Sequence, residues 1–223
     1  TITSIPRDYY VEMAGTNGEY NKINAAHVFG GADMQIKTVE NVLHIPINHY
    51  FSIDMDAMKD LGDAVGGVTV DNAFAFDAEG IHYPKGKQHL GGWEALQYAR
   101  MRYEDPEGDY GRQRRQREVL IELTNKLLSF NSLLKYQEIL DVIGEHGETD
   151  LSFDQMMAML KKYTPALKTI ETDQLKGYDY TGDGVTGIEG ISYQLVEESE
   201  RQRVENAIKE QMNLSKKDTE QSQ

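Results

Sequence analysis

The chain has no cysteine, only five prolines and one tryptophan among its 223 residues. Without cysteine it can form neither a disulfide nor a thiolate metal site, and it has no thiol nucleophile. The printed sequence has no run of about 20 apolar residues, the length that a helix needs to cross a bilayer. Basic residues are also scarce, because 23 lysines and arginines face 37 aspartates and glutamates, for a formal net charge of -14. This acidic balance argues against general nucleic-acid binding, which favours a basic face.

Several familiar catalytic patterns are absent too. The sequence contains no GxSxG, Walker or HExxH motif, and its six histidines are scattered without a paired-ligand spacing. Asp179 opens a stretch that resembles part of a calcium loop, but position 190, where the closing glutamate should fall, is glycine. We therefore interpret that stretch as a glycine-rich surface turn between two strands.

The order of expected elements favours one α/β domain. A chain of this length buries roughly 70% of its unfolded surface on folding, and alternating strands and helices are typical of a three-layer α/β/α domain around a central mixed sheet. We predict one domain over residues 1–214 and a disordered tail over 215–223. Expected strands cover 2–5, 50–55, 68–70, 170–175 and 191–195; a turn-rich approach covers 86–90; expected helices cover 33–43, 58–65, 93–97, 110–129, 133–143, 153–163 and 197–212.

The most informative stretch is 97–118, which holds six arginines in a strongly acidic protein. Arginine suits phosphate oxygens, because its planar fork donates two parallel hydrogen bonds and stays charged at biological pH. If 98–103 is extended, alternation places Arg100 and Arg102 on the same side. These two side chains are therefore candidates for holding an anion.

The expected helix over 110–129 contributes a third candidate. Its apolar stripe comprises Val119, Leu120, Leu123 and Leu127. Continuing the stripe towards the N-terminus in steps of three or four residues reaches Gln116 and then Arg112. A helix N-terminus adds partial positive charge and free N–H groups. For Arg114, Arg115 and Arg117 we favour the plainer interpretation, a solvated surface paired with nearby carboxylates.

Two further cations lie near the start of the chain. Ser4-Ile5-Pro6-Arg7-Asp8 would place Arg7 at the tip of a strand, where α/β proteins usually bind ligands. Lys22 stands just before the next helix. Each is as compatible with a structural role as with a ligand-binding one.

Together these residues resemble the LytR–CpsA–Psr family of cell-wall glycopolymer transferases. The matching pieces are SIPRD at 4–8, KINAAHVFGG at 22–31, IPINHYFSID at 45–54, LGDAVGGVTV at 61–70, and the stretch from 85 to 120. They cover about the first half of the chain, in order. Beyond Leu128 the similarity is in general layout only.

The resemblance implies an α/β/α domain and a phosphotransferase. Such enzymes move a phosphoglycan, of teichoic acid or capsular polysaccharide type, from a polyprenyl-pyrophosphate carrier to peptidoglycan at the extracytoplasmic face of the membrane, mostly in Gram-positive bacteria. By matching motif positions, Arg7, Arg100, Arg102 and Arg112 are expected to contact the pyrophosphate. Lys22 and Gln116 match substrate-binding positions. Asp109 is a weaker, local candidate for accepting the proton of the attacking hydroxyl.

The resemblance also implies Mg²⁺ and a lipid slot. The family's magnesium-binding aspartates precede SIPRD, so we expect the ligands, and an N-terminal membrane anchor, upstream of Thr1 and no metal ligand within this chain. Candidate walls for the lipid tail are Val39, Leu43, Leu123 and Leu127, which ordinary core packing would explain equally well. Two alternatives stay open, a pyrophosphatase acting on polyprenyl-pyrophosphate lipids and a non-enzymatic module that binds anionic wall polymer.

Overall fold

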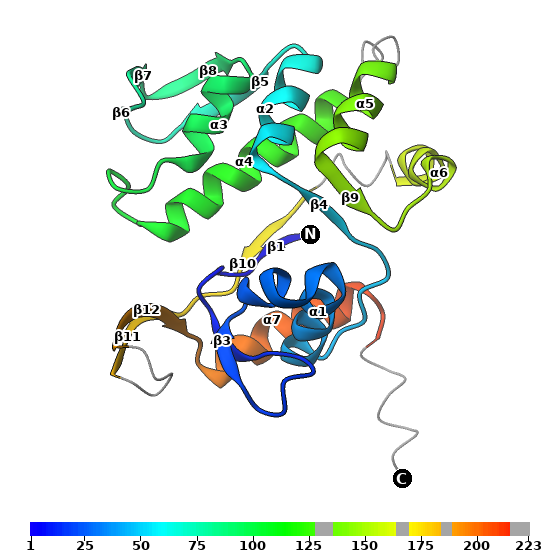
Figure 1. The fold of residues 1–223 in the computed structure, drawn as a ribbon. Helices are drawn as coiled ribbons and strands as arrows, with labels where there is room; N and C mark the ends of the chain where they lie inside the picture. Colours follow the sequence, from blue (N-terminus) through cyan, green and yellow to red (C-terminus); the bar gives the residue numbers. More distant parts are fainter. Residues whose placement is uncertain (128–135, 164–169, 184–188, 215–223) are drawn as a thin grey trace. The chain divides into compact units, whose positions relative to one another are not determined.

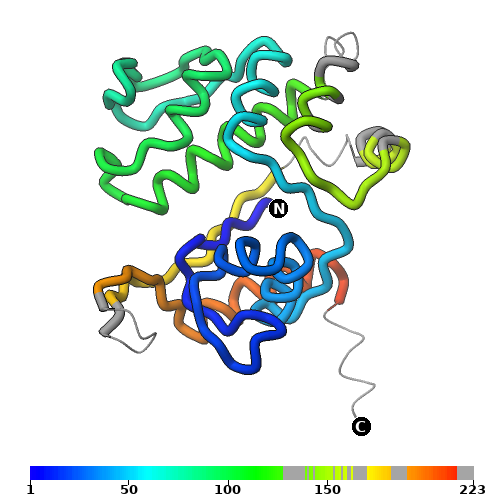
Figure 2. The backbone as a smooth tube through the Cα atoms, in the orientation of Figure 1, coloured from blue at the N-terminus to red at the C-terminus, as the bar shows by residue number. Residues whose placement is uncertain are grey.

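The computed structural model describes residues 1–127, 136–163, 170–183 and 189–214. They fall into two compact units, Thr1–Tyr50 with Glu171–Gln223, and Phe51–Ile170. The first unit thus takes residues from both ends of the chain and the second takes the middle part; Figure 2 traces the backbone in colours that follow the sequence. The tail predicted over 215–223 lies outside the described residues.

The first unit combines short strands with two helices. β1 (Ile2–Ser4) pairs in parallel with β10 (Thr172–Gln174), while β2 (Tyr10–Glu12) with β3 (Tyr20–Lys22), and β11 (Tyr178–Asp183) with β12 (Glu189–Leu195), pair antiparallel. Helix α7 (Glu198–Gln211) packs beside α1 (Ala25–Leu43), as Figure 1 shows. The core between these elements is formed by Tyr9, Val11, Ile23, Leu43, Leu175 and Val204.

Polar contacts fix α7 against the end of α1. The Arg201 guanidinium donates to the Val42 carbonyl over 2.9 Å, which satisfies one of the free carbonyls at the C-terminus of α1. His44 ends the helix in the left-handed conformation, and its Nδ1 lies 3.0 Å from the Glu205 carboxylate. The two helices are thus joined by charge as well as by the apolar core.

The second unit is built on helices with small hairpins. Its elements are β4 (Phe51–Ile53), α2 (Met55–Ala64), β5 (Val68–Asn72), β6 (Phe76–Ala78), β7 (Ile81–Tyr83), β8 (Gly86–Leu90), α3 (Gly92–Arg100), α4 (Asp109–Leu127), α5 (Tyr136–His146), β9 (Gly147–Thr149) and α6 (Phe153–Tyr163). Antiparallel pairs join β4 to β9, β5 to β8 and β6 to β7. Helix α2 packs on α3 and α5, and α4 packs on α3 and β5.

Local sequence explains the main elements of this unit. Asp54 caps α2, because its carboxylate accepts a hydrogen bond from the Ala57 N–H over 2.7 Å. In β5, Val68 and Val70 are buried while Thr69 and Asp71 are exposed, the alternation of a strand with one face on the core. Around them pack the aromatic rings of Phe76, Tyr83 and Tyr98, with Phe76 and Tyr83 stacked at 4.8 Å between centroids.

The predicted α/β class is confirmed. Both parallel and antiparallel pairs occur, but the strands described here pair two by two rather than in one continuous central sheet. The extended backbone considered for 98–103 is not observed, because helix α3 continues through Arg100. Within the ranges that the structure describes, every helix falls short of the length and apolar character that crossing a bilayer requires.

Candidate anion-binding site

The segment between α3 and α4 is a tight, internally bonded turn. The Asp105 carboxylate accepts the Glu107 N–H over 2.7 Å, and its carbonyl accepts the Gly108 N–H over 2.9 Å. Pro106 lies between them, where its fixed φ favours a turn. The turn delivers the chain into α4, which begins at Asp109.

Arg115 is the buried brace of this segment. Only 2% of the residue is exposed, and its Nε donates to the Tyr98 carbonyl over 3.0 Å. Its two terminal nitrogens contact the Met101 carbonyl and the Asp105 carboxylate, so one side chain joins α3, the turn and α4. The guanidinium also lies 5.6 Å from the Phe76 ring centroid and 5.9 Å from that of Tyr98, within cation–π range.

The interpretation of Arg115 as a surface charge is therefore wrong. Leu120, which we placed in the apolar stripe, is 41% exposed, and the buried stripe of α4 runs through Arg115, Val119 and Leu123 instead. A shift of one residue rotates the stripe by about 100° on a helix of 3.6 residues per turn. Sequence reasoning could have found Arg115, since it lies four residues before Val119 and close to the aspartate of a tight turn.

Gly111 makes room for the buried pair. A Cβ atom at this position would lie 1.8 Å from the Asp105 carboxylate oxygen Oδ2, so a larger residue would displace the carboxylate. Asp105 is itself buried. Gly111 thus allows the aspartate of the turn to reach Arg115.

Arg100 and Arg102 lie at the end of α3 and at the start of the turn that follows it, and both side chains are exposed. Arg100 is the last residue of α3, and Met101 leaves the helix with φ −55° and ψ 134°. Arg102 follows in non-helical backbone. Both guanidinium groups are accessible to an anion, while the backbone between them is held by Arg115 through the Met101 carbonyl.

Arg112 is held by the first residue of its own helix. Its side chain is 14% exposed and contacts the Asp109 carboxylate, whose second oxygen accepts a 2.8 Å hydrogen bond from the Gln113 side chain. Asp109 therefore orients a cation, a role that competes with the proton-accepting role suggested for it. Gln116 is half-buried one turn further along α4. Gln113, which sequence reasoning missed, is the glutamine that supports Asp109.

The first unit carries its own cationic group. Lys22 Nζ lies 3.0 Å from the Asp8 carboxylate, and Arg7 Nε lies 3.6 Å from the same oxygen. The Arg7 carbonyl accepts the Asn24 N–H over 3.3 Å, which ties this strand end to the start of α1. The structure thus brings Arg7 and Lys22 together on Asp8, and it places the other candidate arginines in the second unit.

The candidate lipid-pocket residues divide between the two cores. Leu43 is buried in the core of the first unit with Val39 packed against it, and Leu123 is buried in the core of the second unit with Leu127 packed against it. Ordinary core packing accounts for all four. A lipid slot at these residues stays a prediction.

Metal ligands do not converge in the described parts of the chain. There, no group of three or more histidine, aspartate or glutamate side chains could hold an ion. The stretch that opens at Asp179 runs along β11 towards β12, and residues 184–188 of it lie outside the described residues.

Comparison with known proteins decides the family. The model of the LytR–CpsA–Psr (LytR_cpsA_psr) family matches residues 1–210. The chain belongs to this family. As a LytR–CpsA–Psr protein it is 47% identical over 213 residues to a polyisoprenyl-teichoic acid–peptidoglycan teichoic acid transferase, TagU, of Enterococcus faecalis, which covers 96% of this chain and 68% of the relative. A TagU of Bacillus mycoides is 44% identical over the same shares.

Solved structures show the same fold for this LytR–CpsA–Psr protein. An Enterococcus faecalis protein described as a transcriptional regulator superposes with a TM-score of 0.83 at 44% identity, covering 95% of this chain and 77% of that one. TagU of B. subtilis gives a TM-score of 0.72 at 34% identity, covering 93% and 83%. The predicted family and α/β class are thereby confirmed.

Proposed function

We propose that this protein is a phosphotransferase that moves a phosphoglycan from a polyprenyl-pyrophosphate carrier to peptidoglycan. Its family and its TagU relatives, which are named teichoic acid transferases acting on peptidoglycan, support the reaction class. The structural observation that carries the proposal is the Arg115 brace, which holds the backbone bearing Arg100, Arg102 and Arg112. Rigid cations suit a reaction that depends on stabilising developing negative charge.

The proposed step breaks the phosphoanhydride bond of the donor and forms a phosphodiester. A peptidoglycan hydroxyl attacks the phosphorus atom attached to the glycan, a new P–O bond forms, and the bond to the lipid phosphate breaks. The hydroxyl proton leaves with a base, and polyprenyl monophosphate departs. Arginines stabilise the charge that grows on the departing phosphate, as positioned cations do in phosphoryl transfer generally.

Each candidate arginine has a distinct place in this proposal. Arg100 and Arg102 supply exposed guanidinium groups that can contact phosphate oxygens, on backbone that Arg115 holds at Met101. Arg112 is less free, because Asp109 orients it at the start of α4. There the N-terminus of the helix adds partial positive charge. In the first unit Arg7 and Lys22 are proposed as further phosphate ligands, with Asp8 limiting where they point.

Magnesium dependence is a prediction from the resemblance alone. No group of three or more histidine, aspartate or glutamate side chains converges in the described residues, so we assign no step to the ion. The place of action, the extracytoplasmic face of the membrane, is proposed from the chemistry of the donor, whose polyprenyl tail stays in the bilayer. N-terminal anchoring stays a prediction as well.

Acceptor dependence tests the proposal against a pyrophosphatase. The protein is incubated with a lipid-linked phosphoglycan, with and without peptidoglycan, and the products are separated. A transferase releases polyprenyl monophosphate together with glycan bound to peptidoglycan. Equal release without the acceptor, and no labelled peptidoglycan, would instead indicate hydrolysis. Retention of the donor without cleavage would indicate a binding module.

A further inference from the structure

Three side chains of α3 lie along one side of the helix. Trp93, Gln97 and Arg100 are separated by four and three residues, the spacings that place helical side chains on one face. The core side of the same helix is formed by other residues, Ala95 and Ala99 among them. At 1.5 Å per residue, the row from Trp93 to Arg100 is about 10 Å long. A ligand lying along the helix can therefore contact all three side chains, here called the α3 row.

Each member of the α3 row carries a hydrogen-bond donor without an acceptor in the parts of the chain that the structure describes. Gln97 is 4% exposed, and its Nε2 is buried without a partner. The Trp93 indole N–H and the Arg100 guanidinium also lack an acceptor within those ranges. A buried donor without an acceptor costs free energy, and such groups are rare in native proteins. A ligand rich in oxygen atoms would supply the acceptors.

The side chains on either side of the Gln97 amide are accessible. One turn before it Trp93 is 49% exposed, and one turn after it the Arg100 side chain is exposed. The terminal torsion of a glutamine is broad, so the amide can turn towards a ligand that lies between these two side chains. The acid nearest to the row on this helix is Glu94, whose carboxylate lies near the helix start, because a Cβ atom at Gly91 would be 2.7 Å from its Oε2. The α3 row thus combines a flat aromatic ring, an amide and a cation.

A sugar phosphate offers the matching groups in the matching order. Its ring has an apolar C–H face on which an indole can stack, and its hydroxyl and carbonyl oxygens accept hydrogen bonds from an amide. Its phosphate accepts two parallel hydrogen bonds from a guanidinium group. A bare diphosphate would leave the aromatic ring unused, and a lipid tail would leave the amide without an acceptor. The α3 row therefore favours a sugar that is joined to a phosphate.

Both ends of α3 are held in place by hydrogen bonds. At the start of the helix, the Gly92 N–H donates to the Asp63 carboxylate of α2 over 2.7 Å. At its end, Arg115 contacts the Tyr98 and Met101 carbonyls. A helix held in this way presents the α3 row with little loss of freedom on binding, which favours affinity.

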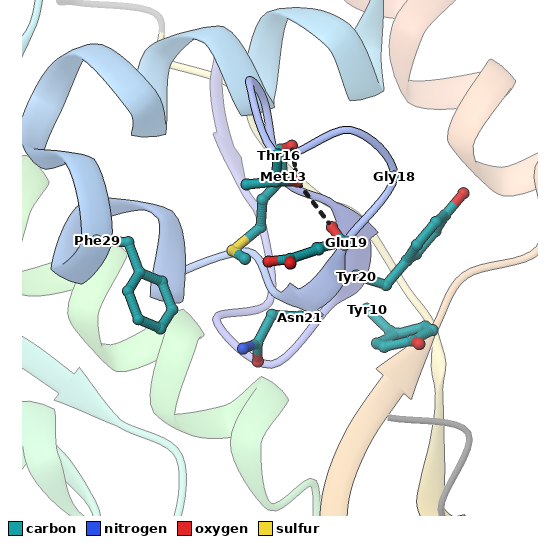
Figure 3. Close-up of a pocket in the computed structure, with 8 residues that line it drawn as sticks. All are labelled: Tyr10, Met13, Thr16, Gly18, Glu19, Tyr20, Asn21 and Phe29. Atoms are coloured by element: carbon teal, nitrogen blue, oxygen red, sulfur yellow. Dashed lines mark hydrogen bonds between the residues drawn. The ribbon is translucent and has the colours of Figure 1, made fainter. Parts of the chain in front are cut away.

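The hairpin of β2 and β3 carries a pocket without such convergence. A space of about 620 Å³ is bordered there by Tyr10, Glu19, Tyr20, Asn21 and Phe29. In Figure 3, the rings of Tyr10 and Tyr20 lie on one side of the hairpin, while Glu19 and Asn21 lie on the side of Phe29, as the strand register requires. The aromatic and polar groups of that pocket do not face one ligand, whereas the α3 row lies on a single helix face.

We propose that the α3 row binds the sugar that is joined to the diphosphate of the donor. The choice of ligand rests on the proposed function, in which Arg100 contacts that diphosphate. With the phosphate on Arg100, Gln97 donates to a hydroxyl or carbonyl oxygen of the sugar about one helical turn away. Trp93 covers the C–H face of the sugar. Gln97 and Trp93 thus determine specificity for the glycan, beside the arginines that hold the phosphates.

A matched pair of lipid diphosphates tests the subsite. Farnesyl diphosphate, and the same compound with N-acetylglucosamine joined to its terminal phosphate, are titrated into the full chain by calorimetry. We expect Trp93→Leu to weaken binding of the sugar-bearing compound by about tenfold and to leave binding of farnesyl diphosphate unchanged. Tyr178→Leu, at an exposed tyrosine of β11, is the control and should bind both compounds like the wild type. Equal losses for both compounds, or no loss in Trp93→Leu, would overturn the proposal.

Gln97→Met distinguishes a ligand-binding amide from a structural one. Replacing an unpartnered buried donor by an apolar group of similar shape should leave the temperature of unfolding unchanged or raise it. Binding of the sugar-bearing compound alone should weaken. A lower unfolding temperature together with wild-type binding would show that the amide is structural, and would overturn its place in the subsite.

Two further results separate this subsite from the alternatives. Weaker binding of soluble peptidoglycan strands by Trp93→Leu, with the donor compounds unaffected, would assign the α3 row to the acceptor and overturn the proposal. None of these titrations needs turnover. A protein that binds the sugar here but transfers nothing would therefore sink the proposed function while leaving the subsite intact.

Discussion

At the scale of single residues, Arg115 shows how a cation can serve a site without touching its ligand. It is the most buried of the arginines on the segment, and it contacts the backbone carbonyls of Tyr98 and Met101, on either side of Arg100. Burying an ion pair is expensive, but removing one partner leaves the other charge uncompensated. Arg115 is therefore a positioning residue whose loss should be felt first as instability.

Arg115→Met should lower the free energy of unfolding by about 3–5 kcal/mol, because Asp105 would be left buried and unpaired. Urea unfolding of the full chain measures the change. Arg114→Met is the control, since its pair with Glu107 is exposed and worth about 0–1 kcal/mol. Adding Asp105→Leu to Arg115→Met should recover part of the loss. Equal stability of Arg115→Met and wild type would refute the brace.

Tyr83 should make the second unit sensitive to alkali. Burial, with a smaller contribution from Glu94, raises the pKa of Tyr83 from 10.0 to about 12. The folded state therefore keeps a proton that the unfolded state releases, so this stabilisation is complete below pH 10 and is lost between about pH 10 and 12. The urea concentration at the unfolding midpoint should fall less between about pH 10 and 12 in Tyr83→Phe than in the wild type. In Tyr103→Phe, which changes an exposed tyrosine, it should fall as much as in the wild type. Parallel curves for Tyr83→Phe and wild type would count against this assignment.

At the scale of elements, α7 is held to the end of α1 by a charged network. Burial alone would raise the pKa of Glu205, but hydrogen bonds from Lys209, His44 and Arg201 outweigh it and lower that pKa to about 2. The carboxylate thus favours the folded state fully above its ordinary pKa of 4.5. That contribution disappears as pH falls from about 4.5 to 2.

Glu205→Gln should flatten this acid dependence. Circular dichroism of the full chain during acid titration provides the measurement, and Glu210→Gln, exposed near the end of the same helix, provides the control. We expect Glu205→Gln to be less stable at pH 7 and to lose less between pH 4.5 and 2. A wild-type acid profile in Glu205→Gln would show that the network contributes nothing.

Two helical glycines should respond oppositely to alanine. Gly111→Ala should destabilise by about 1–3 kcal/mol, because the new Cβ would collide with Asp105. Gly144→Ala in α5 meets nothing within 4 Å and should stabilise by roughly 0.5–1 kcal/mol through helix propensity. Thermal unfolding of both variants gives the comparison. A stabilised Gly111→Ala would mean that Asp105 can move freely.

Long, periodic elements could be predicted from the sequence, whereas short ones could not. Helix α6 was expected over 153–163 and observed there, and α4, expected from residue 110, begins at Asp109. The stretch 98–103, Tyr-Ala-Arg-Met-Arg-Tyr, alternates like a strand, yet helix α3 continues through Arg100, since short runs fit either period. Gly86–Leu90 was expected as turns and forms β8, because its partner β5 supplies the pairing.

At the scale of the whole molecule, the candidate phosphate-binding cations come from a few short segments of an otherwise acidic chain. Arg7 and Lys22 are presented by the first unit, and Arg100, Arg102 and Arg112 by the second. Other basic side chains, such as Arg201 and Arg203, form ion pairs with carboxylates. The family motifs identified the candidate cations Arg7, Lys22, Arg100, Arg102 and Arg112 from the sequence. The contacts of Arg115, Gly111 and Gln113, which support the arginines of the second unit, required the structure.

The transfer rate of Arg102→Ala tests the central claim most directly. Purified wild type, Arg102→Ala and the exposed control Arg114→Ala are given lipid-linked phosphoglycan and peptidoglycan, after unfolding curves have shown equal stability. We predict that Arg102→Ala transfers glycan at least about a hundredfold more slowly, while Arg114→Ala keeps the wild-type rate. Transfer by Arg102→Ala at the wild-type rate would contradict the assignment of these arginines to the diphosphate.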